Sequence, residues 1–230
     1  NNKIADNFFD CFLEDKKFTA TVITPAKGSS VKKEVRFVPF GHQDKLPVRI
    51  MKKIADNTIV GSNIEFKANM AYGDGLMVCR RVKNPETQKI ELEELTPEEA
   101  PEIFQFISDS NYLRVMSELA NDLVVFSDSF VYLAFGKRKA GEKPKVVQIW
   151  HREMCFSRIS EQDEKTKRIE YHGYSSQWGE ESFPDDVIVT RLLDRRSPLY
   201  DLKVRTGLVP DPETGEKKDE EENGYTLSLN

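Results

Sequence analysis

The sequence contains few residues of the kinds that build disulfides and metal sites. Among its 230 residues are three cysteines and three histidines. The cysteines, odd in number and outside any CxxC pair, indicate free thiols in a reducing compartment. The histidines form no HExxH or HxH arrangement, so we expect no metal site. These six residues are Cys11, Cys79, Cys155, His42, His151 and His172.

Motifs for nucleotide hydrolysis and nucleophilic catalysis are also missing. The sequence has neither the Gly-rich loop that ends in Gly-Lys-Ser/Thr nor a GxSxG motif. An SxxK spacing occurs twice, at Ser29 and Ser30, without the partner motifs that would support catalysis. We therefore predict that the protein is not an enzyme, with no catalytic, cofactor-binding or metal-binding residues. The alternative is a hydrolase that uses carboxylates or His151 and His172, on strands that we expect to be neighbours.

The sequence lacks a long apolar run and an excess of basic charge. No stretch of about 18 apolar residues exists, so we expect no membrane-spanning segment. The net charge of −5 argues against a domain that wraps nucleic acid tightly, because such domains carry a basic surface. It is compatible with loose passage of DNA past an acidic or neutral wall. The 38% hydrophobic share supplies a core, and the length fits one large domain or two small ones.

The clearest helical region runs from Asp44 to Tyr72. Asp44 is the expected N-cap, and Pro47 suits the first turn, where a missing N–H costs little. Asn57-Thr58 interrupts the periodicity, so we expect two helices, the second closed by Gly73. The apolar face of the first consists of Leu46, Ile50 and Ile54.

Two further helices and a series of strands follow. Thr96-Pro97-Glu98-Glu99 predicts a helix start with a capping box, and a second helix is expected from Asn111 to Phe126. Alternation and β-branched residues predict the strands. The expected strands are Phe18–Ile23, Val31–Val38, Leu76–Val82, Ile90–Leu95, Phe130–Phe135, Val146–His151, Glu153–Ile159, Arg168–Tyr174, Val187–Leu193 and Tyr225–Leu229. This order indicates an α+β fold with helices packed on mixed or antiparallel sheets.

Basic clusters and tryptophans are the remaining candidates for function. Arg80, Arg81 and Lys83 form one cluster, and the segment from Lys137 to Lys145 forms another. Both are interpreted as solvated loops, with phosphate contact as the alternative. Trp150 is expected in the core. For Trp178, a packing anchor and a subunit interface are equally good interpretations.

The order and spacing of several segments are informative. An aromatic-Gly pair and a polar run precede Leu-Pro in Phe40-Gly41-His42-Gln43-Asp44-Lys45-Leu46-Pro47, and Tyr72-Gly73-Asp74-Gly75-Leu76 is a Gly-x-Gly turn. Further along lie Asn121-Asp122-Leu123, Phe130-Val131-Tyr132-Leu133, Ile149-Trp150, the strand through Arg158, and Tyr174-Ser175-Ser176-Gln177-Trp178. Together they resemble the N-terminal, wing-like region of the portal proteins of tailed bacteriophages or prophages. One departure is Ser127-Asp128-Ser129, where that family often has glycine.

The resemblance implies a structural subunit of a portal ring, the head-tail connector at the DNA-entry vertex of the viral capsid during packaging and ejection. The implied partners are identical subunits, capsid protein, terminase, a head-tail adaptor, and double-stranded DNA that passes without sequence readout. It implies no cofactor and no membrane, with the protein in the virion and, during assembly, in the host cytoplasm. A protein-binding module is a further alternative.

The same reading divides the chain into three parts. Residues 1–35 form an N-terminal arm and strands, residues 36–200 a portal-like α+β core, and residues 201–230 a polar acidic loop with a terminal strand. The stem and clip of the family are not recognisable, so the resemblance implies that they lie further along a longer chain.

Overall fold

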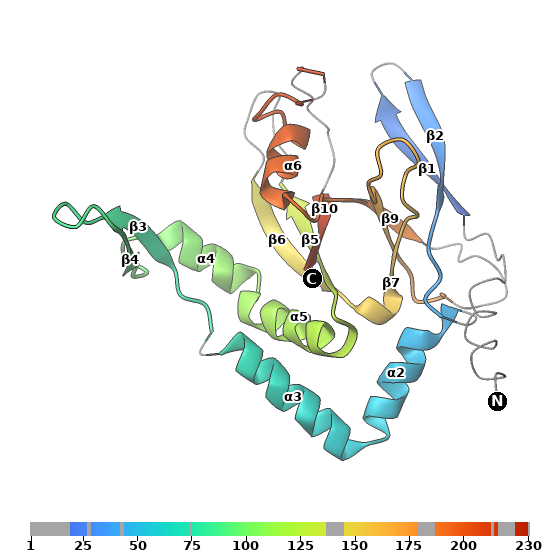
Figure 1. The fold of residues 1–230 in the computed structure, drawn as a ribbon, viewed down its shortest axis with the longest axis horizontal. Helices are drawn as coiled ribbons and strands as arrows, with labels where there is room; N and C mark the ends of the chain where they lie inside the picture. The colour runs from blue at the N-terminus through green and yellow to red at the C-terminus, as the bar shows by residue number, and fades with distance from the viewer. Residues whose placement is uncertain are drawn as a thin grey trace.

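The centre of the molecule is a mixed β-sheet (Figure 1). The computed structural model describes residues 19–26, 29–41, 44–73, 75–136, 145–178, 187–212, 214–215 and 224–229. The sheet strands are β5 (Ser129–Phe135), β6 (Val146–Arg152), β7 (Ser157–Ile159), β8 (Tyr171–Tyr174), β9 (Ile188–Leu192) and β10 (Gly224–Leu229). Their spatial order is β6-β5-β10-β9-β8-β7, with β10 parallel to β9 and the other neighbours antiparallel. The expected α+β class, with helices on mixed and antiparallel sheets, is confirmed.

The last strand lies in the middle of this sheet. Strand β10 pairs with β5 along its whole length and with β9 through Tyr225 and Thr226. A Cβ at Gly224 would lie 2.3 Å from the carbonyl oxygen of Leu133, so only glycine allows this close approach. The assignment of residues 201–230 to a part separate from the core stays a prediction. Strand β10, which belongs to those residues, completes the central sheet.

Helix α5 (Tyr112–Phe126) covers β5 and β6. Its start and end agree with the sequence prediction. Val115 and Leu119 are buried against Val131 and Ile149. Leu113 is instead 56% exposed, because Val115 occupies the inward position.

A helical arm extends along one side of the sheet domain (Figure 1). We define the arm as residues 44–109. It contains α2 (Leu46–Ala55), α3 (Thr58–Tyr72), the antiparallel hairpin β3 (Cys79–Lys83) and β4 (Ile90–Glu94), and α4 (Pro101–Asp109). The predicted break between two helices is confirmed, since the Asn57 side chain accepts a hydrogen bond from the Val60 N–H at the start of α3. Gly73, with φ of 64°, closes α3 as expected.

Two predicted helix starts were wrong. The Glu99 carboxylate accepts from the Thr96 N–H as a capping box would, but this bond closes a turn, and α4 begins at Pro101. Proline at the first helical position needs no donor, so the helix starts there. The N-cap of α2 is Lys45 rather than Asp44, and the Asp44 side chain turns into the interior.

The remaining elements frame the sheet. A hairpin of β1 (Thr19–Ala26) and β2 (Ser29–Arg36) is followed by Phe37, which bridges to Ser160 after β7. The strand predicted at Glu153–Ile159 is in part a 3-10 turn, η2 (Met154–Phe156), because the chain turns a corner between β6 and β7. Helix α6 (Pro198–Arg205) was not predicted, although Ser-Pro at its start is a helix signal.

Candidate functional site

Two sequence segments that are 114 residues apart meet where α2 begins. Arg158, in β7, donates from Nε to Asp44 Oδ1 at 2.6 Å and from Nη2 to the Asp44 carbonyl at 3.0 Å. Both side chains are 1% exposed. The contact joins the start of the helical arm to the edge of the main sheet, and we call it the arginine node.

Backbone groups provide further partners for the node, although Asp44 Oδ2 is buried without a hydrogen-bond partner. Arg158 Nη1 donates to the carbonyls of Ser157, at 2.7 Å, and Cys155, at 3.3 Å. Asp44 Oδ1 also accepts from the Phe40 N–H at 2.5 Å. Arg158 thus fixes the η2 corner and the loop before α2 in one geometry, with Asp44 held at a φ of 57°.

Burial has opposite effects on the two charged partners. It raises the pKa of the Asp44 carboxyl, and the nearby Arg158 guanidinium and the Phe40 N–H oppose that rise. It lowers the pKa of Arg158, and attraction to Asp44 opposes the fall. Removal of either partner would leave the other charge buried without compensation, which is strongly unfavourable.

Trp178 forms one wall of the node. Its indole ring centroid lies 5.4 Å from the Arg158 guanidinium carbon, and its Nε1–H donates to the Phe156 carbonyl at 2.7 Å. The ring also packs on Phe37, with centroids 5.7 Å apart. With 5% exposure, Trp178 is a packing anchor in this chain rather than an exposed interface residue.

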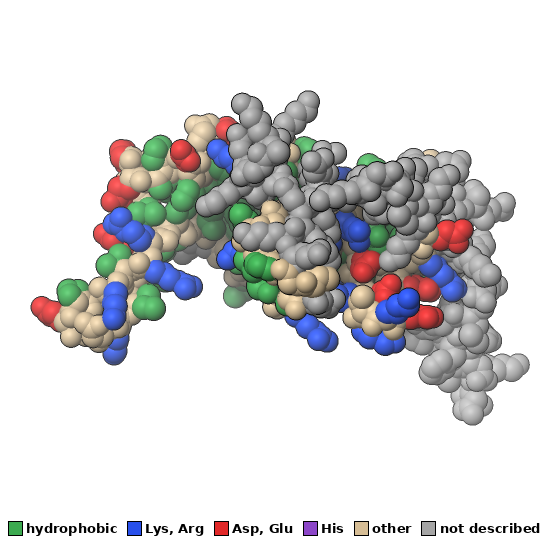
Figure 2. Space-filling view, turned by 90° about the horizontal axis from the view of Figure 1, so that it is seen from above, with side chains coloured by type: hydrophobic (Ala, Val, Ile, Leu, Met, Phe, Trp, Pro, Cys, Tyr) green, Lys and Arg blue, Asp and Glu red, His purple; other side chains and the backbone are tan. Residues whose placement is uncertain are grey.

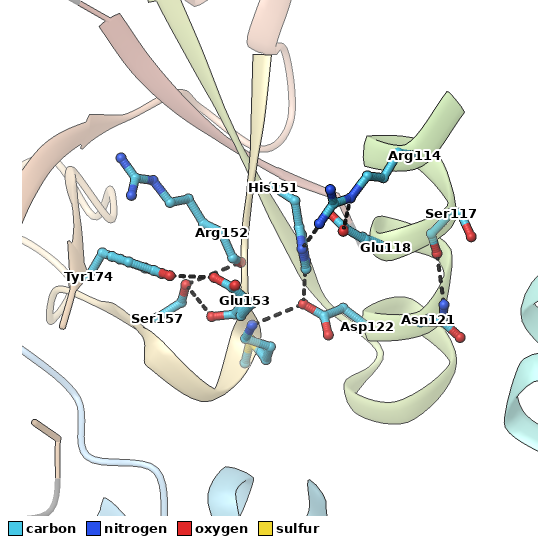
Figure 3. A network of polar contacts seen from close by, with 11 residues as sticks. Arg114, Ser117, Glu118, Asn121, Asp122, His151, Arg152, Glu153, Ser157 and Tyr174 are labelled. Carbon is cyan, nitrogen blue, oxygen red and sulfur yellow. Dashed lines mark hydrogen bonds and ion pairs between the residues drawn. The ribbon is translucent and has the colours of Figure 1, made fainter. Parts of the chain in front are cut away.

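A second polar network joins α5 to the corner after β6 (Figure 3). His151 Nε2 and Asp122 Oδ2 are 2.7 Å apart, and the same oxygen accepts from the Met154 N–H at 2.9 Å. His151 Nδ1 lies 3.5 Å from Glu118, which also accepts from Arg114 at 2.8 Å. Because both ring nitrogens face carboxylates, neither is directed at a nucleophile as a general base would be.

The structure separates the histidines that the sequence had suggested as neighbours. Strands β6 and β8, which carry His151 and His172, have β5, β10 and β9 between them, so the expectation of adjacent strands is wrong. His172 is buried against the Phe130 ring, at a centroid distance of 4.7 Å, and neither of its ring nitrogens has a hydrogen-bond partner. Desolvation and the charge of Arg152 lower the pKa of His172 to about 3. His42 lies outside the described residues.

Other candidates have structural surroundings that explain them. Trp150, expected in the core, is 42% exposed and stacks on Tyr132, because β6 is an edge strand. In the first basic cluster, Arg80 pairs with Glu93 across the β3–β4 hairpin at 2.9 Å. The second cluster lies outside the described residues except for Lys145, which is exposed. Burial raises the pKa of the Cys155 thiol to about 11, so it is a weak nucleophile at neutral pH.

A basic cavity of about 450 Å³ lies beside α6. Arg195 on its wall pairs with Asp128 at 2.7 Å, and Arg205 pairs with Asp201 at 2.9 Å. These ion pairs offset part of the positive charge, and the cavity also contains acidic groups. Its charged lining residues are Lys167, Arg168, Glu170, Asp194, Arg195, Arg196 and Arg205.

The arm exposes many large apolar side chains. Ile59, Phe66 and Met70 on α3 are 75%, 64% and 68% exposed, and Leu92 on β4 is 70% exposed. Figure 2 shows hydrophobic side chains among acidic and basic ones at the end of the arm. This many exposed large apolar side chains on one arm is typical of an interaction surface. Further exposed apolar residues of the arm are Leu46, Val48, Met51, Val60, Leu76, Met77, Val82, Ile90 and Ile103.

Comparisons with known proteins return no relative: no family model, no curated protein and no solved structure matches this chain. Over the described residues, no helix has the length and apolar character needed to cross a membrane. In the same residues, no group of three or more His, Cys, Asp or Glu side chains is arranged to hold a metal ion.

Sequence reasoning missed the roles of Asp44 and Arg158. Asp44 resembles an ordinary N-cap, and Arg158 lies in a short strand with nothing nearby in sequence to mark it as buried. The available signal was the resemblance to portal proteins. Asp44, Arg158 and Trp178 all belong to the segments whose order and spacing carry that resemblance.

Proposed function

We propose that this protein is a structural subunit of a phage portal ring and contributes a wing-like region to it. The observation that carries the proposal is the arginine node. Asp44, Arg158 and Trp178 come from three separate segments of the resemblance, and all three pack around one buried guanidinium. Motif residues that build one interior contact are expected if the segments belong to a common fold.

The exposed apolar arm supports the oligomeric part of the proposal. A side chain such as Ile59 or Leu92, each at least 70% exposed, is unfavourable in water unless a partner covers it. A ring subunit has a neighbour on each side, which would cover such surfaces. The hairpin β3–β4 has the same requirement, since a two-stranded sheet is only marginally stable alone.

The hydrolase alternative receives no comparable support. His151 is bonded to Asp122, and His172 is fully buried and lies on a strand that does not adjoin β6. We therefore keep the portal subunit as the proposed function.

The test uses the intact product of the gene that encodes this chain. Purified protein would be examined by native mass spectrometry and negative-stain electron microscopy, and we expect closed rings of one subunit type. Terminase and capsid genes beside this gene would be the expected neighbourhood. A product that stays monomeric at the highest concentration reached would refute the proposal.

A further inference from the structure

The two ends of the arm carry opposite charges. Helix α2 and the residue before it have four cations and no acidic residue: Lys45, Arg49, Lys52 and Lys53. We call this surface the basic end. From β4 to the first turn of α4 the chain has six glutamates and no cation: Glu91, Glu93, Glu94, Glu98, Glu99 and Glu102. We call this surface the acidic end.

Part of each charged surface has no partner within the chain. Among the described residues, the four cations of the basic end form no ion pair. At the acidic end, Glu93 pairs with Arg80 and Glu99 binds Thr96, whereas Glu94, Glu98 and Glu102 have no ion-pair partner in the described part of the chain. All of these side chains are exposed.

Apolar side chains accompany the charges at both ends. Val48 and Met51 are exposed between the cations of α2, at 46% and 42%. At the other end, Leu92 and Ile103 are exposed among the glutamates. Each surface thus combines exposed apolar side chains with charged ones, a combination that protein interfaces contain.

The two ends are far apart in one molecule, so they cannot cover each other. In Figure 1, α2 lies at one end of the arm and the β3–β4 hairpin with α4 lies towards the other, with α3 between them. Complementary surfaces at opposite ends of one chain produce head-to-tail association, which closes into a ring when the rotation between copies allows it.

We propose that the occupant of each end is a second copy of this chain, with the basic end of one copy docked on the acidic end of the next. This inference rests on the proposed ring function and assigns its subunit contact. Lys52 and Lys53 would face Glu94 and Glu98 of the neighbour, while Val48 and Met51 pack on Leu92. Opposite charges would set the direction of the contact, since like ends repel.

Charge reversal in the intact gene product tests this contact. One variant carries Lys52→Glu and Lys53→Glu, and a second carries Glu94→Lys and Glu98→Lys. In each variant alone every joint brings like charges together, so we expect the association constant to fall by about tenfold or more. In an equimolar mixture, unlike ends meet at every joint, and we expect assemblies with equal numbers of both variants by native mass spectrometry.

The matched control reverses two exposed cations outside the arm, Lys145→Glu and Lys165→Glu. It changes the net charge as much as the first variant does, and we expect it to assemble like the wild type. Circular dichroism would establish that each variant is folded. We also expect wild-type association to weaken as salt rises, because the contacts are near the surface.

The outcomes separate this inference from the proposed function. If rings form and neither reversal changes them, or if the folded variants fail to assemble when mixed, the head-to-tail contact is wrong and the ring function stands. If mixing restores association but the wild type itself forms only open chains, the contact stands and the ring function is wrong. If the wild type does not self-associate at any salt concentration, both are wrong.

Discussion

Replacement of Arg158 by methionine removes one charge from a fully buried pair while it keeps most of the side-chain length. Asp44 would then stay 1% exposed without its Arg158 partner, and the carbonyls of Ser157 and Cys155 would lose their donor. Loss of one partner from a buried pair costs about 3–5 kcal/mol. Because single domains have about 5–15 kcal/mol of stability, this variant should be close to unfolding.

Urea denaturation followed by circular dichroism would measure the free energy of unfolding. Asp44→Asn should also be destabilising, although asparagine can still accept from the Phe40 N–H. In the double variant no charge is left unpaired, so its loss should be smaller than the sum of the two by about 1–3 kcal/mol. Arg114→Met is the matched control, since its ion pair with Glu118 has a 2.8 Å contact but Arg114 is 72% exposed, and we expect no measurable change.

The reasoning would be refuted by an Arg158→Met loss of less than about 1 kcal/mol, which is the range of an exposed ion pair. Additive losses in the double variant would also count against it, because a direct interaction requires coupling. Arg158→Lys gives a further check, since lysine lacks the planar fork that reaches both Asp44 and the backbone carbonyls.

Two other changes test the interior near β8. The folded-state pKa of His172 is about 3 and its ordinary value is 6.5, so only the unfolded chain takes up this proton between those pH values. The contribution of His172 to the free energy of unfolding is complete above pH 6.5 and falls by about 1.4 kcal/mol for each pH unit below that value. Urea denaturation at pH 4.5 and at pH 6.5 should show this dependence, and His172→Leu should remove it. Gly173→Ala would bring a Cβ within 2.7 Å of the Phe37 ring and should cost about 1–3 kcal/mol. Gly61→Ala, inside α3 with nothing nearer than 3.7 Å, should instead raise the melting temperature slightly. Equal effects of the two glycine changes would mean that space around Gly173 is not limiting.

Local sequence signals were sufficient for most of the elements. The break at Asn57, the end of α3 at Gly73 and the span of α5 follow from caps and periodicity, which depend on neighbouring residues. The same signals misplaced the start of α4, because a capping box at Thr96 stabilises a turn as well as a helix.

Long-range contacts were beyond those signals. Sequence indicated a terminal strand but not that β10 would lie between β5 and β9, since strand pairing depends on which surfaces meet in three dimensions. For the same reason His151 and His172 looked like neighbours along the chain, while three strands separate them in the sheet.

The sequence by itself determined the α+β class, the break between helices α2 and α3 of the arm and the charges along the arm, because propensity, capping and composition are local properties. Only the tertiary structure decided that Asp44 pairs with Arg158 rather than capping α2, and that many apolar side chains of the arm are exposed to water. Burial and pairing depend on contacts between segments more than 100 residues apart, and no local pattern contains that information.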